Sequence, residues 1–201
     1  MLSIFLIFFA FFLFIDTPHF FLYFAFGSII MERILVKIIT EQTEILFKNL
    51  EAQLKGADLE KIFDNVNNSR YLFHALHSLD RYFINPYRYE YKMDEQLGLD
   101  ENLSIIDEKR EGYIEAAGVV IEREKLLSYF DFVKAKIFSY LDSLTDSDLS
   151  EKPEECPHTK LALILGQYRH LMFHVGLSEA VNFEANGNWL EYTGFSYFKN
   201  K

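Results

Sequence analysis

The chain has 201 residues, which is long enough for one domain with a sizeable core and too short for two comfortable domains. Its formal net charge is -10 and no basic patch stands out, so nucleic acid is not an expected partner. The single cysteine, Cys156, excludes an intramolecular disulfide framework and a cysteine-based zinc site. One thiol also agrees with a reducing compartment, and we expect the main domain to be cytoplasmic.

Residues 1–30 differ in composition from the rest of the chain and form a hydrophobic N-terminal segment. They hold two apolar runs, each shorter than the roughly 20 residues that a membrane-spanning helix needs. A secretory signal would carry positive charge before its apolar core, and none is present. We therefore expect either that translation begins at Met31, which is the favoured interpretation, or that the segment is a membrane anchor. As an anchor it would leave the main domain, residues 31–201, in the cytoplasm, because Arg33 and Lys37 follow it.

Apolar residues recur at helical spacing in four later segments, which predicts four helices. The predicted helices cover residues 34–56, 70–84, 121–144 and 159–186. Asn67 offers a cap for the second helix, and Gly187 is a suitable C-terminal glycine for the fourth. No strand is expected, and the aromatic tail 189–198 is expected to pack on the helices. The predicted fold class is all-α: an antiparallel four-helix bundle with a long connection, Tyr87 to about Gly118, between helices two and three.

His170 and His174 are one helical turn apart in the predicted fourth helix. Side chains at positions i and i+4 project from the same face, with Cβ atoms roughly 5–6 Å apart, so two imidazoles can share one metal ion. Both lie on a stripe with the a/d spacing of a bundle core. The stripe consists of Leu163, Gln167, His170, His174, Leu177 and Val181. Polar side chains in such a stripe are costly unless something satisfies them, and a bound metal would do so.

The second predicted helix carries two more histidines, His74 and His77, and either can supply a third ligand. Two ligands on one helix and one on a facing helix is a common way for bundles to hold metal. Three histidines leave coordination positions open for water or substrate, as in a catalytic centre. Helical periodicity alone favours His77, because His74 points nearly opposite the apolar Leu76. Imidazole ligands suit zinc, nickel, iron or copper, and the sequence does not choose among them.

Several residues in this region have more than one interpretation. Asp80 can orient a ligand imidazole, or it can be a surface partner of Arg81. The loop Tyr87–Tyr91 can shape a pocket, or it can be a packed surface loop, which is the favoured interpretation. The alternative for the whole protein is a non-catalytic helical bundle that acts as an interaction or dimerisation module, with its histidines merely packed.

The segments around the histidines resemble the DinB/YfiT-like superfamily of metal-binding four-helix bundles. The resemblance covers about Met31 to Trp189. It is carried by His74-Ala-Leu-His-Ser-Leu-Asp-Arg-Tyr-Phe, Leu144-Thr-Asp-Ser-Asp-Leu149 and Arg169-His-Leu-Met-Phe-His-Val-Gly176. It implies that a histidine on helix two and the His-x-x-x-His pair on the last helix bind a divalent transition metal, such as zinc, nickel or iron. The helix-two ligand of the family is typically followed four residues later by a serine, and Ser78 therefore selects His74. The implied ligands are His74, His170 and His174.

Family members of known activity include thiol-dependent S-transferases, in which the metal activates a low-molecular-weight thiol. Metal coordination lowers the pKa of a thiol and supplies thiolate at neutral pH. The resemblance therefore implies a divalent-metal-binding, DinB-like protein that acts as a metal-dependent thiol S-transferase or hydrolase. A small thiol or another small molecule is the expected substrate, and a homodimer is the expected assembly.

Overall fold

The computed structural model describes residues 33–92, 98–115, 119–194 and 196–197. The hydrophobic segment 1–30, and with it the predicted division between this segment and residues 31–201, lies outside the described residues. The elements in chain order are α2 (Ile34–Gly56), β1 (Ile62–Phe63), β2 (Val66–Asn67), α3 (Asn68–Tyr82), η1 (Glu101–Ser104), α4 (Arg123–Ser143), η3 (Asp148–Ser150) and α5 (Lys160–Asn186). The described part of the chain is thus mostly helical, as the sequence predicts. Its helices include none that is both long enough and apolar enough to cross a membrane.

The helix ends lie close to the predicted positions: Asn67 and Gly187 act as the predicted caps, and Thr159 also caps its helix. The side chain of Asn67 accepts a hydrogen bond from the backbone N–H of Arg70 at the start of α3. Thr159 accepts one from the N–H of Ala162 at the start of α5. At the other end of α5, Gly187 adopts the left-handed conformation, with φ 72°, and its N–H donates to the carbonyl of Phe183.

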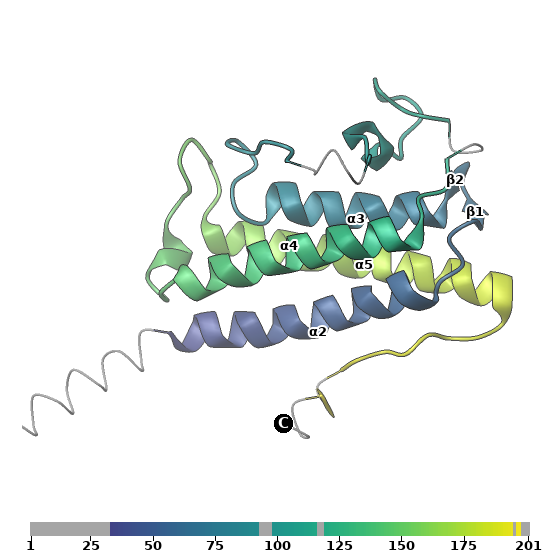
Figure 1. Ribbon diagram of the computed structural model, residues 1–201. Helices are drawn as coiled ribbons and strands as arrows, with labels where there is room; N and C mark the ends of the chain where they lie inside the picture. The colour runs from purple at the N-terminus through teal and green to yellow at the C-terminus, as the bar shows by residue number, and fades with distance from the viewer. Residues whose placement is uncertain (1–32, 93–97, 116–118, 195, 198–201) are drawn as a thin grey trace, which may run out of the picture.

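The helices pack through their apolar faces, and Figure 1 shows them lying alongside one another. Helix α3 contacts both α4 and α5, and α2 contacts the same two helices from the other side. The core between them is made of leucines and aromatic residues with almost no exposed surface. The largest are Phe47, Leu50, Leu54, Leu72, Phe73, Leu76, Leu79, Phe83, Leu126, Tyr129 and Phe130.

The expectation that the chain has no strand is wrong for one short hairpin between α2 and α3. Strands β1 and β2 pair antiparallel, with Ile62 opposite Asn67 and Phe63 opposite Val66. The turn between them is formed by Asp64 and Asn65, both at positive φ, which these residue types tolerate better than most. Two-residue strands are too short to show an alternating pattern in the sequence.

The C-terminal tail returns to α2, as the sequence predicts, but its largest aromatic side chains stay exposed. The backbone N–H of Thr193 donates to Asn49, and the side chain of Leu190 lies against Gly56. Trp189 is 67 % exposed and stacks on Phe183. The tail is therefore held on α2 by the backbone of Thr193 and the side chain of Leu190, while the ring of Trp189 stays exposed.

The long connection between α3 and α4 covers the face of α3 that points away from α2 (Figure 1). Its central attachment is Arg70, which is fully buried. The guanidinium donates to three backbone carbonyls of the connection, those of Leu103, Ile105 and Ile114. The ring of Tyr113 lies 5.2 Å from its charged carbon. As a result, α3 is surrounded on nearly all sides, and side chains opposite its apolar face are also enclosed.

Replacing Asn67 with alanine should lower the free energy of unfolding by about 1–3 kcal/mol, because one side chain caps α3 and also holds the connection. Its Oδ1 accepts from the Arg70 N–H at 3.1 Å, and its Nδ2 donates to the carbonyl of Val119. Urea unfolding monitored by circular dichroism measures the loss. Asn67→Asp keeps the acceptor that caps the helix but not the amide donor, so it should lose less stability than Asn67→Ala. A stability within 0.5 kcal/mol of wild type for Asn67→Ala would contradict this role.

Candidate metal centre

Three histidines from two helices point their Nε2 atoms at one another. His74 lies on α3, and His170 and His174 lie one turn apart on α5. The His170 Nε2 is 3.3 Å from the Nε2 of His74 and 3.1 Å from that of His174. One ring nitrogen of each histidine lies within 4.8 Å of those of the other two. The two helices therefore bring together the three histidines that the family resemblance selects.

These distances fit three ligands of a single divalent ion. Ring nitrogens bound tetrahedrally to zinc at about 2.0–2.1 Å lie about 3.3 Å from one another. The two Nε2 separations on either side of His170 are close to this value. The three side chains can thus hold a metal ion without rearrangement of the helices.

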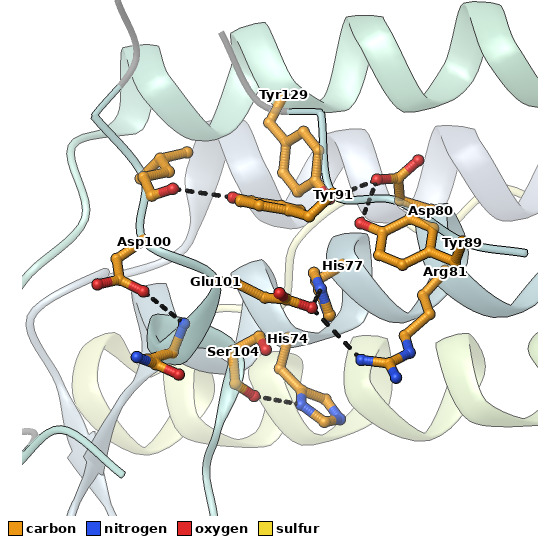
Figure 2. A network of polar contacts seen from close by, with 12 residues as sticks. His74, His77, Asp80, Arg81, Tyr89, Tyr91, Asp100, Glu101, Ser104 and Tyr129 are labelled. Carbon is orange, nitrogen blue, oxygen red and sulfur yellow. Dashed lines mark hydrogen bonds and ion pairs between the residues drawn. The ribbon is translucent and has the colours of Figure 1, made fainter. Parts of the chain in front are cut away.

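A backbone carbonyl fixes which nitrogen of His74 faces the cluster. The Nδ1 atom lies 2.6 Å from the carbonyl oxygen of Ser104, in η1. A carbonyl only accepts, so Nδ1 carries the hydrogen and Nε2 presents its lone pair to the other two histidines. Figure 2 shows this bond, with His74 below the segment that carries Ser104. Such a contact to the second ring nitrogen is a common way to orient a histidine ligand.

All three imidazoles are held in the neutral form that binds metals. Burial lowers the pKa of His74, although its hydrogen bond to Ser104 opposes the shift. Burial, reinforced by the charge of His74, lowers the pKa of His170 to about 4. Burial and the two neighbouring histidines lower that of His174 to about 3. Binding a cation at neutral pH therefore requires little or no displacement of protons from these rings.

Two ring nitrogens of the cluster lack partners. The Nδ1 atoms of His170 and His174 are buried without a hydrogen-bond partner among the described residues, as are Gln167 Oε1 and Ser178 Oγ on the same helix. Gln167 precedes His170 by one turn, and Ser178 follows His174 by one turn, so each can approach its neighbour. Buried polar atoms without partners destabilise the fold.

In metal-free protein, the lowered histidine pKa values predict a loss of stability on acidification. An unfolded histidine takes up its proton near pH 6.5, whereas His170 and His174 do so only near pH 4 and pH 3 in the folded protein. Below about pH 6.5 the unfolded state therefore binds more protons, and the free energy of unfolding falls as the pH falls toward about 3. Each histidine contributes a slope of at most about 1.4 kcal/mol per pH unit. Urea unfolding of chelator-treated protein between pH 7 and pH 4 measures how the free energy of unfolding depends on pH.

The control is the variant His170→Gln/His174→Gln, which keeps the carboxylates that also titrate in this range. Its stability should depend less steeply on pH than that of wild type. Equal slopes for the two proteins would show that these histidines are not held neutral by the fold.

His77 lies apart from the cluster, although periodicity favours it as the third ligand. It is 5 % exposed, and its Nε2 lies 3.0 Å from the Glu101 carboxylate. The rings of Tyr89 and Tyr91 contact it edge-on. In Figure 2 the His77 ring points to Glu101, while the His74 ring lies lower in the view, beside Ser104. His77 therefore belongs to a neighbouring polar network.

A cavity of about 260 Å³ adjoins His74. It lies between α3 and the connection, and its lining is mostly polar and charged. The lining residues are His74, His77, Ser78, Arg81, Tyr82, Glu101, Asn102, Ser104, Ile105 and Arg110. Five of these come from a connection without sustained periodicity, so no pattern in the sequence marks them: Glu101, Asn102, Ser104, Ile105 and Arg110.

Both interpretations of Asp80 are wrong. The carboxylate is buried and accepts hydrogen bonds from the hydroxyls of Tyr89, at 2.7 Å, and Tyr129, at 3.1 Å. Lys136 completes the group at 2.5 Å (Figure 2 shows the two tyrosines). Asp80 thus neither orients a cluster histidine nor pairs with Arg81. The loop Tyr87–Tyr91 packs on α3 through these contacts and does not line the cavity beside His74.

Comparison of the chain with protein-family models, curated proteins and solved structures gives no match. The functional interpretation therefore depends on the histidine geometry, on the cavity and on the charges around it.

Proposed function

We propose that the protein binds one divalent transition metal through His74, His170 and His174 and acts as a metal-dependent thiol S-transferase or hydrolase of the DinB/YfiT-like type. The helices would then form the antiparallel four-helix bundle of that superfamily, and the contacts of α2 and α3 with both α4 and α5 support this arrangement. The convergence of three Nε2 atoms, with separations of 3.3 and 3.1 Å, carries the proposal.

The number of ligands favours a catalytic site over a structural one. Structural zinc sites are almost always closed by four protein ligands, whereas catalytic sites keep a position for water or substrate. The cluster contains three candidate ligands among the described residues. The cavity is lined by His74, though not by His170 or His174, and would bring a small molecule to the edge of the cluster.

The chemistry divides between the metal and the chain. A divalent ion bound here would lower the pKa of a thiol or a water molecule and supply a nucleophile at neutral pH. Ser104 keeps His74 in the tautomer that donates its Nε2 lone pair. Glu101 is the carboxylate among the cavity-lining residues, and it would accept the proton that the nucleophile releases. The positions of Glu101 and His77 are fixed by the bond between them.

In a transferase reaction the thiol sulfur forms a bond to an electrophilic carbon, and the leaving group departs with its electron pair. The thiol proton passes to Glu101 and then to solvent. In a hydrolase reaction water takes the place of the thiol. Both reactions use the same residues, and the experiment below distinguishes them.

The test compares zinc-loaded and chelator-treated protein. We expect about one zinc per chain by elemental analysis. We also expect zinc-dependent formation of a thioether from 2-mercaptoethanol and 1-chloro-2,4-dinitrobenzene, or zinc-dependent hydrolysis of p-nitrophenyl acetate. A folded protein that takes up no divalent metal would overturn the proposal and favour the interaction or dimerisation module. Zinc binding without either activity would limit the function to metal binding.

A further inference from the structure

We propose that the cavity beside His74 selects small molecules that carry a carboxylate, and that Arg81 and Arg110 recognise this group. The inference rests on the proposed metal site and names the class of substrate that this site would take. The substrate would place its reactive thiol or water-activated bond at the histidine end and its carboxylate at the arginine end.

The charges that line the cavity support an anionic ligand. Two guanidinium groups, those of Arg81 and Arg110, face one carboxylate, that of Glu101. Glu101 is already shared between His77 Nε2, at 3.0 Å, and Arg81 Nη1, at 3.3 Å. The protein as a whole carries a formal charge of -10, so this positive region stands out from its surroundings. A bound divalent cation would add to it.

The guanidinium of Arg110 can bind an anionic ligand. Within the described ranges, no hydrogen bond or ion pair engages its guanidinium, unlike that of Arg88, which pairs with Glu154 and Glu155. It also lines the same cavity as His74. An anion between Arg110 and the metal would be attracted by both.

Arg81 is only partly engaged. Its Nη1 contacts Glu101, and its guanidinium lies over the rings of Tyr82 and Tyr89. Its Nε is buried and has no partner among the described residues. Figure 2 shows the guanidinium directed toward Glu101, beside His77. A bidentate carboxylate is the ligand that a guanidinium fork matches best.

The cavity is held in shape before any ligand enters. Arg110 lies in a turn in which its N–H donates to the carbonyl of Asp107, and its own carbonyl accepts from Tyr113. Arg70 holds the flanking backbone through three carbonyls. A preorganised site loses less free energy on ordering when it binds. Its volume of about 260 Å³ is below the range typical of drug-sized ligands, so a small molecule is expected.

Cobalt-loaded protein tests the inference by absorption spectroscopy, because a thiol that binds cobalt changes its visible spectrum. The probes are 3-mercaptopropionate, which carries a carboxylate, and 2-mercaptoethanol, which does not. The preference is the ratio of their two dissociation constants, and comparing it between variants cancels the difference in thiol acidity. We expect Arg110→Gln and Arg81→Gln each to lower the preference for 3-mercaptopropionate by about tenfold. Glu101→Gln, which removes the competing carboxylate, should raise it.

Arg88→Gln is the matched control, because Arg88 is an exposed arginine outside this cavity. The preference of this variant for 3-mercaptopropionate should equal that of wild type. Unchanged preferences in all variants, with cobalt and both thiols still bound, would overturn this inference and leave the metal proposal intact. A protein that binds no cobalt would overturn both. If Arg110→Gln lowers the preference for 3-mercaptopropionate and Glu101→Gln raises it, a merely structural effect is excluded. A loss of structure would change the preference in the same direction in both variants.

Discussion

His170→Ala should raise the dissociation constant for zinc by at least about a hundredfold. The Nε2 of His170 lies within 3.3 Å of the Nε2 of His74 and within 3.1 Å of that of His174, so it is the central member of the cluster. Changes to groups that merely support a ligand already cost about 10–100-fold in affinity, and loss of a ligand should cost more. Competition with a chromophoric chelator at pH 7 measures the constant.

Two other histidines supply the controls. His77→Ala removes a buried histidine of α3 that bonds to Glu101 instead of the cluster. His158→Ala removes an exposed histidine before α5. Both variants should bind zinc within a few-fold of wild type. Equal affinities for His170→Ala and His158→Ala would show that His170 is not a ligand, and a large loss in His77→Ala would favour the interpretation from periodicity.

Arg70→Met should lower the free energy of unfolding by about 3–9 kcal/mol. The guanidinium is fully buried and satisfies the carbonyls of Leu103, Ile105 and Ile114. Methionine fills similar space but leaves three carbonyls without a donor, at about 1–3 kcal/mol each. Urea unfolding measures the total loss. Amide hydrogen exchange should also show lost protection across 99–115 before the helices open.

Arg88→Met is the control for Arg70→Met, since Arg88 makes only exposed ion pairs, which contribute about 0–1 kcal/mol. If Arg70→Met does not fold, Arg70→Lys, which keeps a charge but not the three-way geometry, should fold with reduced stability. A loss below 1 kcal/mol for Arg70→Met would mean that the connection is held by other contacts.

The helices were predictable because local signals and burial agree in them. Asn67, Thr159 and Gly187 all act as caps where capping preferences place them. The apolar repeat of α2 begins at Ile34 and ends at Gly56, within the predicted bounds. The short hairpin at 62–67 could not be found by the same means, because two residues per strand are too few to show an alternating pattern.

The choice between His74 and His77 shows where periodicity fails. The prediction from periodicity treats the face of α3 opposite Leu76 as exposed, since an amphipathic helix normally has one buried side. In the structure the connection covers that face, and the carbonyl of Ser104 binds His74 there. His77 is more completely buried than His74, so burial favours the same histidine as periodicity does. The motif with Ser78 selects the histidine that lies in the cluster, because it depends on spacing rather than on the apolar face.

The charged part of the candidate site was not predictable from local sequence. Glu101 and Arg110 lie 27 and 36 positions after His74 in a polar connection, and only tertiary packing brings them to its side. Asp80 was misread for the same reason. Its partners Tyr129 and Lys136 lie on α4, and no helical spacing relates them to α3.

X-ray absorption at the zinc edge identifies the atoms bound to the metal ion. Zinc-loaded wild-type protein should show three imidazole nitrogens at about 2.0–2.1 Å, with a further light atom from solvent. The His74→Ala variant should show the loss of one imidazole. A zinc shell made mainly of oxygen, or one unchanged in His74→Ala, would contradict a metal centre built from His74, His170 and His174.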